Sequence, residues 1–161
     1  MKNKATLSII FILLCFNLFF AKVPDFSLKS INDNEIKFSE YIGKKIIVID
    51  FWATWCKPCK KLLKDLNKIY KELNNEIEVF AISVDNSQAI QSVENYIKAR
   101  RFKFKVLLDS DRRVNNYFNP SNVIPFTVII NKKGEVSYAH SGYIPGYIKE
   151  LKSKIKEILE N

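Results

Sequence analysis

The stretch FWATWCKPCK, residues 51–60, places two cysteines at the boundary between two kinds of sequence. Just upstream, the segment 45–53 (KIIVIDFWA) is apolar except for its first residue and Asp50, which predicts a central strand buried on both faces. Downstream, apolar residues recur every three or four positions, which predicts an amphipathic helix ending near residues 74–75. Cys56 is therefore expected at the N-terminus of a helix that directly follows a buried strand.

This position favours a reactive thiolate at Cys56. A helix N-terminus offers unsatisfied N–H groups and the positive end of the macrodipole, and with the charge of Lys57 these lower a cysteine pKa from ~8.5. Cys59 follows one helical turn later on the same face, where it can resolve a mixed disulfide formed at Cys56. Pro58 fits the first turn, where it removes no intrahelical hydrogen bond. The expected chemistry is thiol–disulfide exchange.

Asp50 is the second candidate for this chemistry. A carboxyl group among bulky apolar neighbours is expected to be at least partly buried, with a raised pKa. If it points toward the cysteines, it can exchange a proton with Cys59; the alternative is a strand-end residue that reaches water. The neighbouring pair favours the proton-transfer role. Trp52 is expected in the core, and Trp55 is expected to be exposed and to shape the substrate groove.

Residues 1–21 are predicted to be an export leader, because two lysines precede an apolar run from Leu7 to Ala21. As a helix this run reaches roughly 22 Å at ~1.5 Å per residue, short of a ~30 Å hydrocarbon core. A signal peptide cleaved after Ala21 is the first interpretation, an uncleaved membrane anchor the second, and lipidation at Cys15 the least favoured. The protein is expected to be exported, to the periplasm or the outer face of the cytoplasmic membrane.

Residues 22–161 are predicted to form one domain, in which Cys56 and Cys59 are the only cysteines. A domain of this size does not need a disulfide for its stability, and a disulfide that closes so short a loop removes little entropy from the unfolded chain. A purely structural disulfide is therefore not favoured. The predicted order is β-β, β-α-β-α-β-α, β-β, α, an α/β mixed sheet with helices on both faces. Ser39 and Ser110 are expected to cap short helices, and Gly134 to take the tight position of a hairpin turn.

The segment VIDFWATWCKPCK resembles the active-site segment of the thioredoxin superfamily, and Ile124–Pro125 resembles its second signature. The leader, an N-terminal hairpin and a strand–helix insertion over residues 81–118 resemble the exported TlpA/ResA type, along essentially the whole of residues 23–160. The resemblance implies a thioredoxin-like fold with a cis peptide bond before Pro125. It also implies that the Ile124 backbone, with Trp55, Lys57 and Pro58, contacts an extended substrate.

The same resemblance implies a thiol-disulfide oxidoreductase that needs no cofactor beyond the Cys56–Cys59 disulfide. Reduction of disulfides in exported proteins is the favoured direction, and oxidation stays open because no sequence feature decides between them. Its partners would be cysteine-containing exported substrates and a membrane redox protein that regenerates the dithiol. Apocytochrome c is a client of several relatives, and these often carry a glutamate three residues after the second cysteine. Leu62 occupies that place here. The departure puts the cytochrome-specific role in doubt.

Two further functions stay open at this point. Copper delivery would need a ligand beside the cysteine pair, and the lone histidine, His140, lies far along the chain in a predicted strand, so no metal is expected. A binding or chaperone module would bind its partner through an apolar patch formed by the two tryptophans, and the cysteines would have no role in its function. The net charge of +9 comes without basic residues interleaved with aromatics, which argues against nucleic acid. We expect a monomer that touches membrane only through an uncleaved leader.

Overall fold

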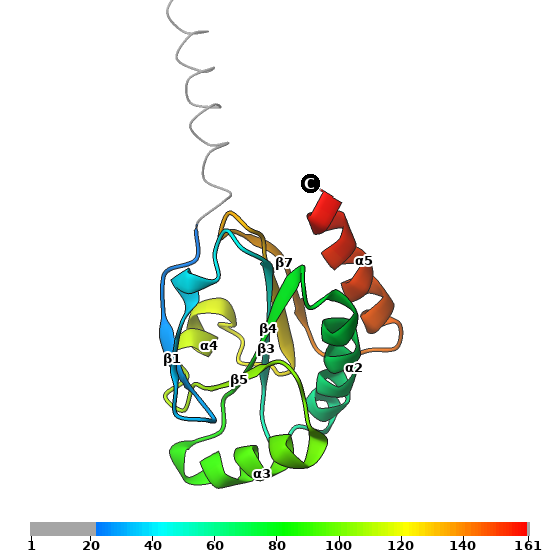
Figure 1. Cartoon of the computed structure of the whole chain (residues 1–161). Coiled ribbons are helices and arrows are strands. Elements are labelled where there is room, and N and C mark those ends of the chain that lie inside the picture. Colours follow the sequence, from blue (N-terminus) through cyan, green and yellow to red (C-terminus); the bar gives the residue numbers. More distant parts are fainter. Residues whose placement is uncertain (1–21, 161) are drawn as a thin grey trace, which may run out of the picture.

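The computed structural model describes residues 22–160. The predicted leader, residues 1–21, and its proposed cleavage or lipidation lie outside the described residues. The chain forms a seven-stranded sheet in the order β2-β1-β5-β4-β3-β6-β7 (Figure 1). The strands are β1 (Ser27–Ser30), β2 (Glu35–Lys37), β3 (Ile46–Trp52), β4 (Ile77–Ser83), β5 (Lys105–Leu108), β6 (Phe126–Ile130) and β7 (Val136–Ser141).

The centre of the sheet is built from β3 and β4, which run parallel with Asp50 opposite Ala81. Every residue of both strands is buried, as predicted for apolar segments that helices cover on both faces. On one side β6 pairs antiparallel with β3, and β7 forms the edge. On the other side β5 follows β4 in parallel and carries the antiparallel β1–β2 hairpin. The predicted mixed sheet, with its N-terminal hairpin and antiparallel C-terminal edge, is confirmed.

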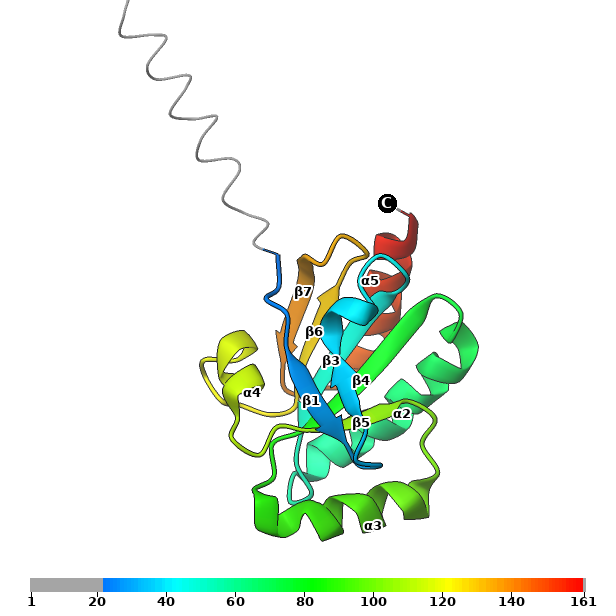
Figure 2. The same ribbon diagram turned by 60° about the vertical axis from the view of Figure 1, so that its left-hand side comes forward.

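Helices cover both faces of this sheet (Figures 1 and 2). Phe51 packs on Phe118, with ring centroids 6.0 Å apart, on the face that α4 covers. Because side chains alternate along a strand, Asp50 and Trp52 face the opposite side, where Trp52 meets Tyr96 of α3. That side is also covered by α2 and α5. The helices are α2 (Lys57–Leu73), α3 (Ile90–Arg100), α4 (Arg113–Phe118) and α5 (Tyr147–Glu160), with 3-10 turns η1 (Phe38–Glu40) and η2 (Ser87–Ala89).

The helix that carries the cysteines, α2, follows the amphipathic pattern of its sequence. Its inward side buries Cys59 and four aliphatic residues, whereas its lysines lie half-buried or exposed. These aliphatic residues are Leu62, Leu63, Leu66 and Ile69. At roughly 1.5–3 kcal/mol for each fully buried side chain, this face anchors the helix firmly to the sheet. The N-terminus of α2 is thereby fixed relative to β3.

Both serine caps were predicted wrongly. The helix α4 begins only at Arg113, because Arg112 adopts a left-handed conformation with φ 59°, and no side chain of Arg112 caps it. The carboxylate of Asp109 instead accepts hydrogen bonds from the N–H groups of Val114 and Asn115. Ser39 lies inside η1, which has no side-chain cap, and its N–H donates to Asp25. A carboxylate from outside the helical turn competes successfully with a local hydroxyl in both places.

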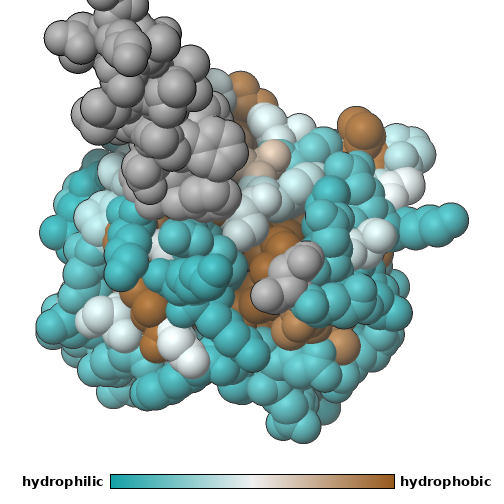
Figure 3. Space-filling model, turned by 90° about the horizontal axis from the view of Figure 1, so that it is seen from above, coloured by the Kyte–Doolittle hydropathy of each residue, from teal (hydrophilic) through white to brown (hydrophobic). Residues whose placement is uncertain are grey.

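The Gly134 turn is as predicted: this residue has φ 82°, and its N–H donates to the Asn131 carbonyl at 3.0 Å. The surface seen in Figure 3 is largely hydrophilic with small hydrophobic areas between polar groups, in keeping with the many lysines. Within residues 22–160, no helix has the length and apolar character needed to cross a membrane.

Candidate active site

The two cysteines form a disulfide at the N-terminus of α2, with their Cα atoms 5.3 Å apart. Cys56 is the N-cap residue, and its Sγ accepts a hydrogen bond from the N–H of Cys59 at 3.2 Å. Pro58 lies in the first turn, as predicted. Cys56 keeps 5% of its surface exposed and Cys59 none. Both cysteines are therefore buried at the positive end of a helix, and Cys56 is the less completely buried of the two.

The turn between β3 and the disulfide is held by Asp85, which follows the adjacent strand β4. Its carboxylate accepts hydrogen bonds from the Thr54 N–H at 2.9 Å and the Thr54 hydroxyl at 2.7 Å. The Ser83 hydroxyl donates a third bond at 2.8 Å. Sequence analysis missed Asp85 and Thr54. The available signal was an aspartate directly after a buried strand, at the sheet edge where the cysteines were predicted.

A second loop approaches the disulfide from the start of β6. The Ile124–Pro125 peptide is cis, as expected from the resemblance. The carbonyl oxygen of Ile124 lies 3.9 Å from the Cys56 sulfur, a packing contact because a disulfide sulfur has no proton to donate. The amide of Asn119 donates to the Val123 carbonyl at 3.0 Å and to the Asn115 side chain at 3.2 Å. These asparagines were also missed, although their density in residues 115–122 marked a polar loop.

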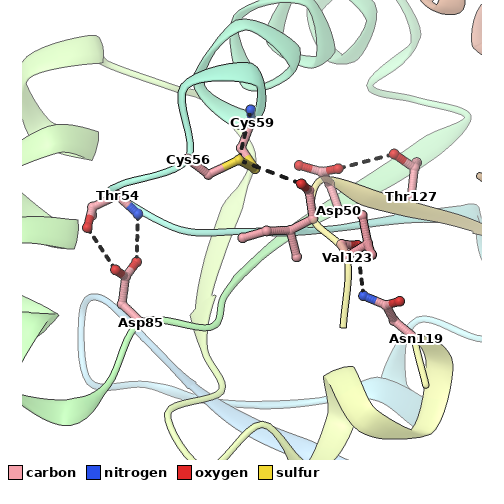
Figure 4. Close-up of a disulfide and its surroundings, with 9 residues drawn as sticks. Asp50, Thr54, Cys56, Cys59, Asp85, Asn119, Val123 and Thr127 are labelled. Atoms are coloured by element: carbon pink, nitrogen blue, oxygen red, sulfur yellow. Dashed lines mark hydrogen bonds between the residues drawn. A yellow bond between two sulfur atoms is a disulfide. The ribbon is translucent and has the colours of Figure 1, made fainter. Parts of the chain in front are cut away.

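Asp50 is fully buried on β3 and points toward the disulfide (Figure 4). Burial raises the pKa of this carboxyl group well above its ordinary value, and the hydrogen bond from Thr127 opposes part of that rise. The Thr127 hydroxyl donates to Oδ1 at 3.1 Å. The other oxygen, Oδ2, is buried and has no hydrogen-bond partner among the residues that the structure describes. The predicted burial and raised pKa are confirmed; Thr127 was not predicted.

The remaining predicted residues divide between the rim and the core. Trp55 keeps 65% of its surface exposed beside the disulfide, whereas Trp52 is fully buried, as expected for each. Lys57 and Pro58 are exposed in the first turn of α2, and Ile124 is half-buried. Leu62, at the place of the family glutamate, is fully buried. No group of three His, Cys, Asp or Glu residues within the described chain is arranged to hold a metal ion.

Comparison with known proteins places this geometry in a family. Residues 21–139 match the model of the AhpC/TSA family. The chain belongs to this family. It is 35% identical over 114 residues to the thiol-disulfide oxidoreductase ResA of Bacillus subtilis, a match that covers 70% of this chain and 62% of that protein. It is 32% identical over 120 residues to ResA of Geobacillus kaustophilus, covering 74% of this chain and 67% of that protein.

The fold has a close counterpart among solved structures. A putative thiol:disulfide interchange protein DsbE from Chlorobium tepidum superposes with a TM-score of 0.78. The alignment covers 87% of this chain and 96% of that one at 23% identity, which shows the thioredoxin-like fold. Together with the CxxC disulfide, the similarity to the ResA proteins makes the chain a thiol-disulfide oxidoreductase of the ResA type.

Proposed function

We propose that this protein is exported and reduces disulfides in exported proteins, with Cys56 as the nucleophile and Cys59 as the resolving cysteine. The observation that carries the proposal is the asymmetry of the pair. Cys56 caps α2 and retains exposed surface next to Trp55 and the Ile124 carbonyl, whereas Cys59 is sealed against the sheet. A client sulfur can reach only Cys56.

The reaction starts from the dithiol. The Cys56 thiolate attacks one sulfur of the client disulfide, the S–S bond breaks, and the departing client sulfur takes a proton from water. A mixed disulfide now joins Cys56 to the client. The Cys59 thiol then gives its proton to the Asp50 carboxylate and attacks the Cys56 sulfur. This step forms the Cys56–Cys59 disulfide and releases the second client sulfur as a thiolate, which takes a proton from water, so two electrons pass to the client.

The rim around Cys56 supplies the client's binding groups. Trp55 offers an exposed apolar surface, and Lys57 and Pro58 border the sulfur on its helix side. The cis peptide at Pro125 places the Ile124 carbonyl beside the sulfur, where it accepts a backbone N–H of an extended segment. A membrane redox protein is the proposed source of the two electrons and two protons that restore the dithiol. Export itself rests on the leader in residues 1–21.

The proposed clients are disulfide-bearing exported proteins in general, rather than haem-binding cysteines in particular. Relatives that act on apocytochrome c often carry an acid where this chain has Leu62. Leu62 is fully buried in the core, so position 62 supplies no acidic group to the cysteine pair. Asp50 is left as the acid that serves the pair.

The test is exchange between the full-length protein and a peptide with one intramolecular disulfide, followed by mass spectrometry. Cys56→Ser is expected to abolish exchange, and Cys59→Ser to accumulate the mixed disulfide at Cys56. Cys15→Ser is the matched control and should keep the wild-type rate. Mixed disulfides that form equally at both cysteines would contradict the assigned roles.

The direction of electron flow is tested by equilibrating the Cys56–Cys59 couple with glutathione buffers. A reductant requires a potential well below that of the exported oxidants, near ~−120 mV for the strongest of them. A value close to that of the oxidants would reverse the proposed direction. Unchanged client binding in the double variant Cys56→Ser, Cys59→Ser would instead favour a binding module, and tight stoichiometric copper binding by the dithiol would favour metal delivery.

A further inference from the structure

A row of polar side chains runs across the sheet from Asp50 to its open edge. Asp50 on β3 lies opposite Thr127 on β6, and Thr127 lies opposite His140 on β7. Residues directly opposite in antiparallel strands project from the same face of a sheet. The three side chains therefore stand side by side on the face that α2 and α5 cover. At the far end His140 is half-buried on an edge strand, between exposed Ala139 and exposed Ser141.

Tyr147, the first residue of α5, covers this row. Its ring stacks on His140, with centroids 4.2 Å apart and an interplanar angle of 18°. Only 1% of its surface is exposed, and burial raises its pKa, with the charge of Asp50 adding to the rise and Thr127 opposing it. The Tyr147 ring therefore closes the row at its His140 end.

Three buried polar atoms of this row have no hydrogen-bond partner within residues 22–160: Asp50 Oδ2, the Tyr147 hydroxyl and His140 Nε2. An unsatisfied buried polar group destabilises the folded protein, and an apolar residue at the same place would avoid that loss. Three such atoms in one row indicate a site whose polarity serves a purpose other than packing. The mechanism supplies that purpose, because Asp50 must return to the carboxylate after each turnover although it has no exposed surface.

We propose that Thr127, Tyr147 and His140 carry the Asp50 proton between the active site and the edge of the sheet at β7. Asp50 Oδ2, the Tyr147 hydroxyl and His140 Nε2 make no direct hydrogen bond to one another, so the proton that Asp50 takes from Cys59 crosses between them on bridging water, and each group that accepts a proton gives up another. His140 delivers the proton to water. The three residues act through Asp50 and do not touch the client. This inference rests on the proposed function.

Few other titratable groups act on this row. Tyr138 on β7 and Glu150 on α5 act on Tyr147, and the Tyr138 hydroxyl donates to Glu150 at 2.9 Å on the exposed side. From α2, Asp65 accepts a hydrogen bond from Tyr143, whose ring meets Tyr147 edge-on. Tyr138 is thus paired with Glu150, and Tyr143 with Asp65. Asp50 and His140 are left as the titratable groups at the two ends of the row.

The test follows the two steps of the reaction separately. The reduced full-length protein is mixed with oxidised glutathione and quenched with acid, and the mixed disulfide and the Cys56–Cys59 disulfide are counted by mass spectrometry across the pH range in which the protein is folded. Tyr147→Phe keeps the stacked ring and removes the hydroxyl. It should leave the attack by Cys56 unchanged and slow the resolving step about tenfold, a small part of the ~10²–10⁴-fold that a positioned acid or base supplies.

A second variant separates proton transfer from packing. His140→Ala should slow the same step by a similar factor, and imidazole added to the buffer should restore the rate, because a diffusing base replaces the missing ring. Tyr138→Phe is the matched control on the same strand and should resolve at the wild-type rate.

Two results would overturn the inference. One is a wild-type rate and pH profile of resolution in both Tyr147→Phe and His140→Ala. The other is slow resolution with an unchanged pH profile and no rescue by imidazole, which would assign these residues a packing role alone. Failure of the unaltered protein to exchange with glutathione would overturn the proposed function, and this inference with it.

Discussion

Two buried aspartates have different roles: Asp50 lies on β3, and Asp85 lies two residues after the end of the neighbouring strand β4. Asp85 accepts three side-chain hydrogen bonds, from the Thr54 N–H, the Thr54 hydroxyl and the Ser83 hydroxyl. Asp50 accepts one, from Thr127, and its second oxygen has no partner. Both lie close to the disulfide (Figure 4). Asp85 thus has three donors to its carboxylate group, and Asp50 has one.

This difference in hydrogen bonding separates a structural acid from a chemical one. A carboxylate with several donors is stabilised in its charged form and holds those donors in place. A carboxyl group buried with a single donor has a raised pKa and can hold a proton at neutral pH. Burial alone does not distinguish them, since Asp85 is 5% exposed and Asp50 fully buried. The number of donors does.

The largest effect on stability is expected from Asp85→Ala. This change leaves the donors of Thr54 and Ser83 without their acceptor, and should lower the free energy of unfolding by about 3 kcal/mol. Urea denaturation measures it. The matched control is Glu94→Ala on α3, which removes an i,i+4 ion pair with Lys98 and should cost about 0.5 kcal/mol or less. Equal losses of unfolding free energy in the two variants would contradict a structural role for Asp85.

Asp50→Asn is expected to stabilise the folded protein while slowing resolution by Cys59. Because burial raises the folded-state pKa of Asp50, the unfolded chain releases this proton at lower pH than the folded one. Stability therefore falls as pH rises from the unfolded pKa of ~3.9 to the folded value, and asparagine abolishes that fall.

At neutral pH the gain from Asp50→Asn should be about 1 kcal/mol or more, and it should shrink below pH ~4. Urea denaturation at the two pH values measures the difference. A gain that is the same at both pH values would show that the ionisation of Asp50 carries no folding cost. A loss of stability at neutral pH would place Asp50 with Asp85 as a structural acid.

The two threonines allow a matched test of the same contrast. Thr54→Val removes one donor from Asp85 and should cost about 1 kcal/mol of stability with no change in the pH profile of exchange. Thr127→Val removes the only side-chain donor to Asp50 found in the described chain, so the Asp50 pKa should rise further. The pH profile of the resolving step should then move to higher pH. Profiles that move equally in both variants would contradict the comparison.

The smallest effect is expected at the exposed rim. Lys57→Gln removes one positive charge beside the Cys56 thiolate, and the dithiol form should lose up to about 1 kcal/mol of stabilisation. The reduction potential should then fall by about 20 mV or less, measured against glutathione buffers. Lys71→Gln, at the other end of α2, is the control and should leave the potential unchanged. A larger shift from Lys71 would rule out a local charge effect.

Much of the fold followed from local sequence patterns. The apolar segment around Asp50 and the helical periodicity after Lys57 predicted the strand–helix junction, and the structure confirms both. The caps at Ser39 and Ser110 failed because Asp25 and Asp109 supply competing carboxylates. The resemblance contributed the cis peptide at Pro125. Local residue spacing can predict helices and strands. It cannot decide which of several hydrogen-bond partners is used when those partners come together only after folding.

By itself the sequence determined the chemistry of the pair: two cysteines in the first turn of a helix after a buried strand, with an aspartate inside that strand. These features depend on neighbours within a few residues, which the chain order specifies. Only the tertiary structure decided that Asp50 is the acid beside the cysteines and that Asp85 is the acid that fixes the turn at Thr54. Asp50 meets Thr127 across 77 positions, and Asp85 meets Thr54 across 31. Strand pairing sets those distances, and the number of donors it brings to each carboxylate separates the two roles.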